Sequence, residues 1–168
     1  YLAVVDYTTI DQTLTSLNNE YNNSSDTNFQ TLLSKLAMLE FCGWIEVSID
    51  EILREYLKKK TLDQSILNTT NEKIHSNWGF NFSSNIQPLF CYVIGVVNWQ
   101  KVLSDLDAIN KKEILISTLN NFNKKRGIAA HTNIQVTHSY DAPSSVQKNF
   151  KNIIDAIKQI EATINSLA

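Results

Sequence analysis

The hydrophobic pattern of the chain repeats with the period of an α-helix along most of its length. The clearest case lies near the C-terminus, where apolar side chains recur at steps of three or four residues: Phe150, Ile153, Ile154, Ile157, Ile160 and Ile164. Alternating patterns typical of strands are almost absent, and there are only four glycines and two prolines. The pattern predicts an all-α fold, an antiparallel bundle of five or six helices forming one domain over residues 1–168.

The longest expected helix covers residues 28–59 and follows a shorter one over 9–19. Asp26 or Thr27 is the expected cap of the long helix. Its apolar residues change face along its length: Phe29, Leu32, Leu33 and Leu36 come first, and Met38, Phe41, Ile45, Ile49, Ile52 and Tyr56 follow on the opposite face. This change predicts a helix that packs on more than one side, at the centre of the bundle.

Residues 61–83 are polar and mixed, so we expect a long connection with a short helix at best. Capping-box spacing at residues 84–87 and 144–147 predicts two helix starts. The first opens a helix over 85–106 that Gly95 interrupts, and a further helix begins near residue 110. Trp78 and Trp99 are expected to pack in the core, which is the more common role of tryptophan, rather than to stack on nucleobases.

Composition narrows the function classes. The net charge is −2, so any anion site must be a local cluster. The basic runs at 58–60, 111–112 and 124–126 are each either a solvated helix end or such a site, and the third gains weight from His131. Cys42 and Cys91 lie in apolar segments without metal-ligand spacing, which predicts reduced core thiols in a cytoplasmic protein and no metal or cofactor. Residues 86–100 are uncharged but short, which favours a buried helix over a membrane span. The chain lacks an initial Met and is expected to be part of a longer polypeptide.

Arg126 and His131 are the strongest candidates for chemistry. A guanidinium offers a fork of donors to phosphate oxygens, and an imidazole exchanges protons near neutral pH. Five positions correspond to about 140° on an ideal helix, so a backbone turn at Gly127 is one way to bring the two side chains to one cleft. Glu46 has apolar helical neighbours; it is either a partly buried carboxylate paired with Arg126 or an exposed residue at a boundary.

The ordered series of these elements resembles the HEPN domain family (higher eukaryotes and prokaryotes nucleotide-binding). The resemblance covers residues 28–168 and rests on three features: Trp44-Ile45-Glu46 within the long helix, the segment Asn81-Phe82-Ser83-Ser84-Asn85 leading to Val93-Ile94-Gly95-Val96, and Arg126-x4-His131. It implies a helical bundle that forms a two-fold dimer, in which the motifs of both copies meet in one ribonuclease site that needs no metal.

The resemblance implies a role for each motif residue. Arg126 would hold the scissile phosphate, and His131 would transfer protons to or from the ribose 2′-hydroxyl and the leaving 5′-oxygen. Supporting roles near them are expected for Asn123, Lys125, Asn133 and Tyr140. The implied function is a homodimeric endoribonuclease acting on RNA, a toxin or antiphage effector with an antitoxin or regulatory protein as partner, without a membrane.

Gly127 departs from the family pattern, in which a polar residue often follows the arginine. The alternative is therefore a catalytically silent HEPN module that mediates dimerisation or binds a nucleotide or a partner protein. A helical bundle unrelated to HEPN domains is the third possibility.

Overall fold

A computed structural model describes the backbone of residues 4–131 and 139–167, and the side chains of this part apart from Ala130 and His131. Over these ranges the chain is all-α, as the hydrophobic pattern predicts. Its elements are α1 (Thr8–Asn23), α2 (Thr27–Lys58), α3 (Gln64–His75), the π-helical turn η1 (Phe82–Ile86), α4 (Gln87–Ile94), α5 (Val96–Ala108), α6 (Lys112–His131) and α7 (Pro143–Ser166). The described part thus has seven α-helices, one more than the upper expectation.

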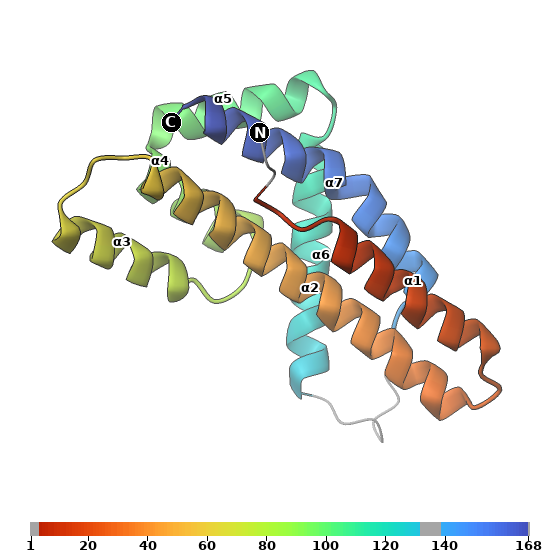
Figure 1. Cartoon of the computed structure of the whole chain (residues 1–168). Coiled ribbons are helices and arrows are strands. Elements are labelled where there is room, and N and C mark those ends of the chain that lie inside the picture. The colour runs from red at the N-terminus through yellow and green to blue at the C-terminus, as the bar shows by residue number, and fades with distance from the viewer. Residues whose placement is uncertain (1–3, 132–138, 168) are drawn as a thin grey trace.

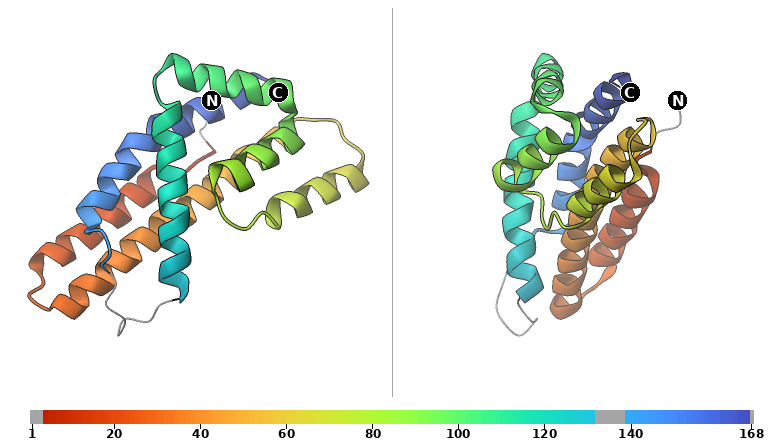
Figure 2. Two further views of the ribbon diagram at one scale, coloured as in Figure 1. Left: turned by 180° about the vertical axis from the view of Figure 1, so that it is seen from behind. Right: turned by 90° about the vertical axis from the view of Figure 1, so that its left-hand side faces the viewer.

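Helix α2 occupies the centre of the molecule. It contacts α1, α3, α6 and α7, and α6 crosses it at a steep angle (Figures 1 and 2). The rings of Phe122 and Phe150 pack edge-on against Phe41, which binds α2, α6 and α7 into one core. The central position of the long helix is confirmed. The prediction that its early face is packed is wrong for Phe29, Leu32 and Leu36, which are 43–48% exposed.

The helix starts differ in part from the predicted caps. Asp26 accepts the backbone N–H groups of Asn28 and Phe29 and caps α2 as expected. Both predicted capping boxes are wrong. The first cap is Asn81 rather than the predicted Ser84: its side chain accepts the N–H groups of Ser83 and Ser84. The π-helical turn therefore begins at Phe82, before the predicted helix start. Helix α7 starts at Pro143 and has no side-chain cap; a proline is tolerated in the first turn, because its missing N–H would have no acceptor within the helix.

Residues 61–83 contain more structure than their polar composition predicts. Helix α3 has 12 residues, is capped by Asp63, which accepts the N–H of Ser65, and buries Thr70 and Ile74. The interruption at Gly95 is confirmed: its φ of 87° lies in the left-handed region that favours glycine, and the chain turns there from α4 into α5.

Two further expectations concern the apolar segments. Cys42 is buried, Cys91 is half-buried, and both are free thiols. None of the helices in the described ranges combines the length and the apolar character needed to cross a membrane.

Candidate functional site

An ion pair between α2 and α6 forms the centre of the candidate site. Arg126 Nη2 lies 3.0 Å from Glu46 Oε2, with the Arg126 side chain 37% exposed and that of Glu46 27% exposed. Of the two alternatives for Glu46, the structure has the partly buried carboxylate paired with Arg126. Because a guanidinium carries five N–H donors, a contact through one nitrogen leaves others for a second anion. Arg126 is thus oriented by α2 while it keeps access to solvent.

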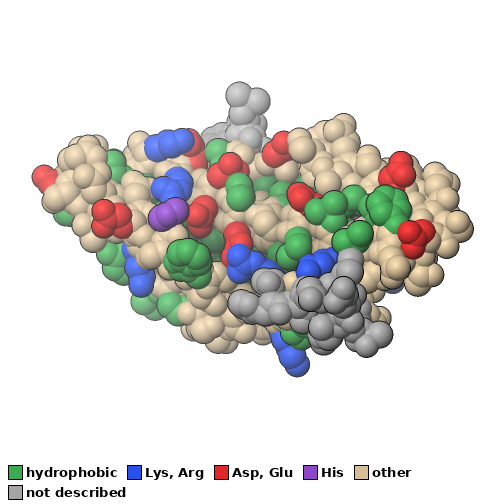
Figure 3. Space-filling view, turned by 90° about the horizontal axis from the view of Figure 1, so that it is seen from below, with side chains coloured by type: hydrophobic (Ala, Val, Ile, Leu, Met, Phe, Trp, Pro, Cys, Tyr) green, Lys and Arg blue, Asp and Glu red, His purple; other side chains and the backbone are tan. Residues whose placement is uncertain are grey.

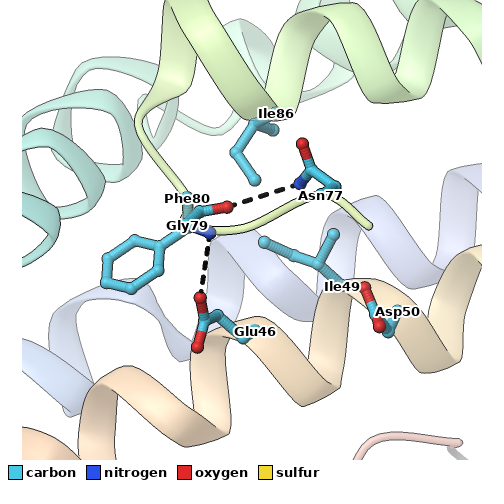
Figure 4. A pocket seen from close by; sticks show the side chains of 7 residues that line it. All are labelled: Glu46, Ile49, Asp50, Asn77, Gly79, Phe80 and Ile86. Atoms are coloured by element: carbon cyan, nitrogen blue, oxygen red, sulfur yellow. Dashed lines mark hydrogen bonds between the residues drawn. The ribbon is translucent and has the colours of Figure 1, made fainter. Parts of the chain in front are cut away.

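The second oxygen of Glu46 holds the connection between α3 and η1. Gly79 donates its N–H to Glu46 Oε1 at 3.1 Å, and Asn77 Nδ2 donates to the Gly79 carbonyl at 3.3 Å (Figure 4). Beneath this loop is a pocket of about 10 Å³, which has room for about one water molecule; it is lined by Glu46, Ile49, Asp50, Asn77, Gly79, Phe80 and Ile86. One carboxylate therefore joins Arg126 to the loop.

Two asparagines of α6 fix the same loop from the other side. Asn123 Oδ1 accepts the N–H of Phe80 at 2.9 Å, and Asn120 Oδ1 accepts the N–H of Phe82 at 2.9 Å. Gly79 has φ +98°, and a Cβ added there would lie 2.9 Å from Asn123 Oδ1, so only glycine fits without a shift. Asn123 thus belongs to the site as a residue that positions the loop.

Lys125 and Tyr140 belong to a neighbouring pocket. Lys125 forms an ion pair with Asp141 and lies 5.3 Å from the centre of the Phe122 ring. A pocket of about 100 Å³ is lined by Met38, Lys125, Ile128, Ser139, Tyr140 and Asp141. The ion pair joins the segment before α7 to α6, at the residue that precedes Arg126.

Helix α6 continues through Gly127 and ends at His131. The backbone turn at Gly127 that would bring the two side chains to one cleft is therefore not present. A continuous helix keeps positions 126 and 131 about 140° apart. The side chain of His131 and the whole of Asn133 lie outside the described residues, so their predicted roles stay predictions.

Burial and neighbouring charges change the acidity of two groups near the pair. Burial raises the pKa of the Asp50 carboxyl, and Glu46 adds to the effect, against the opposing influence of Arg54 and His75. Burial also raises the pKa of the Cys42 thiol to about 12. Figure 3 shows basic, acidic and apolar side chains next to one another across one face of the molecule. Specific contacts, rather than a general positive field, would therefore have to select an anion.

The sequence interpretation missed the part played by residues 77–80. Trp78 is 82% exposed, so the prediction that it packs in the core is wrong, whereas Trp99 is 3% exposed and packs as predicted. The available signal was a glycine between two aromatic residues in an otherwise polar segment, which is typical of a constrained loop.

No family model, curated protein or solved structure matches this chain. Among the described residues, His, Cys, Asp and Glu side chains form no group of three or more that could hold a metal ion.

Proposed function

We propose that this chain is a HEPN-type endoribonuclease that cleaves RNA as a homodimer, in the role of a toxin or antiphage effector under the control of an antitoxin or regulatory protein. The observation that carries the proposal is the Glu46–Arg126 pair. It joins two of the three sequence elements on which the resemblance rests, the glutamate of the long helix and the arginine of the Arg-x4-His motif. The third, the segment that begins at Asn81, follows the loop that Glu46 holds through the N–H of Gly79.

Arg126 binds the phosphate in the proposed reaction. Glu46 holds one guanidinium nitrogen, and the remaining donors contact the non-bridging oxygens of the scissile phosphate. The ribose 2′-hydroxyl loses its proton and attacks the phosphorus, and the bond to the 5′-oxygen breaks as that oxygen takes up a proton. His131 transfers these protons. The products are a 2′,3′-cyclic phosphate and a free 5′-hydroxyl, so atoms and charges balance without a co-reactant.

The helical spacing supports a site shared between two copies. On one continuous helix, positions 126 and 131 lie about 140° apart around the helix axis. A two-fold axis next to α6 lets Arg126 of one copy act together with the partner's His131, because such an axis presents the same helix from both copies.

RNA cleavage in the presence of EDTA tests the proposal. We expect single-stranded RNA of mixed sequence to be cleaved by the native protein and not by Arg126→Ala or His131→Ala. His75→Ala, which changes an exposed histidine at the end of α3, is the matched control and keeps full activity. Mixing the two inactive variants should restore part of the activity, since a mixed dimer retains one intact Arg–His combination. Activity of a monomer would contradict the shared site.

A catalytically silent HEPN module that binds a nucleotide or a partner protein is the second candidate. Two observations favour it: Gly127 is helical and offers no side chain, and both Lys125 and Arg126 are already paired with carboxylates. Dimerisation without any cleavage across an RNA pool would establish this alternative.

A further inference from the structure

Trp78 exposes a large aromatic ring to solvent. Its exposed fraction is 82%, whereas Trp99 is buried, and Trp44 is half-buried and donates its indole N–H to the Asp6 carbonyl. Tryptophan is on average highly buried in folded proteins, because its side chain removes a large apolar area from water. An indole left this open contributes little to folding and is available for a ligand.

The backbone that carries Trp78 is fixed on both sides. Its carbonyl accepts Asn85 Nδ2 at 3.1 Å, and its N–H donates to the Ser76 carbonyl at 3.1 Å. The next two residues donate their N–H groups to Glu46 and Asn123. The indole therefore projects from an ordered loop, and a ligand that contacts it loses less conformational entropy than it would on a mobile segment.

The same contacts connect Trp78 to the proposed phosphate site. Gly79, the residue after Trp78, bonds one oxygen of the Glu46 carboxylate, and Arg126 bonds the other. The backbone that carries the indole and the guanidinium of Arg126 therefore both lie next to the Glu46 carboxylate. An aromatic ring beside a phosphate-binding cation is the combination that binds single-stranded nucleic acid, with a base on the ring and the backbone on the cation.

The residues around Trp78 in the sequence favour a base over an apolar protein surface. The exposed and half-buried side chains of the loop and of η1 are polar: Ser76, Asn77, Asn81, Ser83, Ser84 and Asn85. Phe80 and Phe82 are turned into the core. The buried core of a protein interface is more apolar than the rest of the surface, whereas amides and hydroxyls can bond the edges of a stacked base.

We propose that Trp78 stacks on a nucleobase of the RNA strand whose phosphate contacts Arg126. This inference rests on the proposed function, because it assumes that the ligand is RNA. Stacking tolerates any base, since every base has a π-face. Trp78 would then place the strand in register with Arg126 while leaving sequence preference to other contacts.

Binding of a dye-labelled single-stranded RNA of mixed sequence to the His131→Ala protein tests the inference without cleavage. We expect Trp78→Leu in this background to weaken binding by about 5- to 150-fold, the loss typical of one base stack, and Trp78→Phe to restore most of it. Tyr92→Leu, which changes an exposed tyrosine on α4, is the control and leaves binding unchanged. RNA should also quench the fluorescence of the solvent-exposed tryptophan in the His131→Ala protein, and this signal should be absent when Trp78→Leu is added.

The outcomes separate this inference from the nuclease proposal. Unchanged RNA affinity in Trp78→Leu, or RNA binding without quenching, overturns the stacking role while cleavage by the native protein still supports the nuclease. Quenching and weakened binding in a protein that never cleaves RNA support the stacking role and refute the nuclease. A change in sedimentation mass in Trp78→Leu, with the RNA affinity intact, identifies the indole as a protein contact and overturns the inference.

Discussion

Replacing Glu46 removes two contacts that the structure allows us to separate. Glu46→Gln keeps an oxygen that can accept the Gly79 N–H but removes the charge opposite Arg126. Glu46→Ala removes both contacts and leaves that N–H without its protein acceptor. Because both ionic side chains are about a third exposed, the ion pair is worth no more than about 1 kcal/mol. A hydrogen bond to a charged group adds about 1.5–3 kcal/mol.

We therefore expect Glu46→Ala to lower the free energy of unfolding by about 1.5–4 kcal/mol and Glu46→Gln by about 1 kcal/mol or less. For a chain of this length these losses correspond to decreases in Tm of about 3–16 °C and up to about 4 °C. Urea unfolding followed by circular dichroism measures both values. Glu40→Ala, an exposed glutamate on the same helix, is the control and should change stability by no more than about 0.5 kcal/mol.

Equal losses for the two Glu46 variants would refute the reasoning, because the Gly79 hydrogen bond would then contribute nothing beyond the charge. A loss in Glu46→Gln as large as the one expected for Glu46→Ala would instead show that the ion pair is strongly desolvated. A strongly desolvated ion pair would disagree with the exposures of the Arg126 and Glu46 side chains.

Three further predictions concern the surroundings of the site. Asn123→Ala should cost about 1–3 kcal/mol in urea unfolding, because it leaves the N–H of the buried Phe80 without its acceptor, and Asn123→Asp should recover much of this loss. The raised pKa of Asp50 means that its charged form destabilises the fold, so Asp50→Asn should have a higher Tm than the native protein at pH 7. This difference in Tm should shrink as the pH falls, because the native carboxyl becomes protonated. A difference that grows toward acidic pH would contradict the prediction. At pH 8 the thiol of Cys42, with its pKa raised to about 12, should not react with a thiol reagent in the folded protein, while the half-buried Cys91 reacts and both react in denaturant.

The hydrophobic pattern predicts the elements that bury a continuous apolar face. Helix α7 buries Phe150, Ile153, Ile157, Ile160 and Ile164, all named from their spacing. Helix α3 was underestimated because its core contribution is only Thr70 and Ile74, while the Asp63 cap and packing against α2 stabilise the rest. The face of α2 that carries Phe29, Leu32 and Leu36 shows the opposite error, since apolar spacing alone does not show whether a partner element covers it.

The candidate site, too, could be predicted from the sequence only in part. The Glu46–Arg126 pair was one of two alternatives that the sequence allowed for Glu46, because a partly buried carboxylate requires a partner. The position of the loop at residues 77–80 could not be predicted, although its glycine indicates a constrained loop, since that position depends on hydrogen bonds to Glu46 and Asn123, which lie far away in the sequence. Gly79 is required by this tertiary packing rather than by any local motif.

Cleavage of DNA strands that each contain one ribonucleotide tests whether the ribose 2′-hydroxyl is the attacking group. In a pool of random sequence and with EDTA present, the native protein should cut only after the ribonucleotide, leaving a 2′,3′-cyclic phosphate, because that residue alone supplies the attacking hydroxyl. A 2′-O-methyl group at the same position should abolish the cut, as should Arg126→Ala. Cleavage of the all-DNA strand, or cleavage that survives the 2′-O-methyl group, would contradict the proposed reaction.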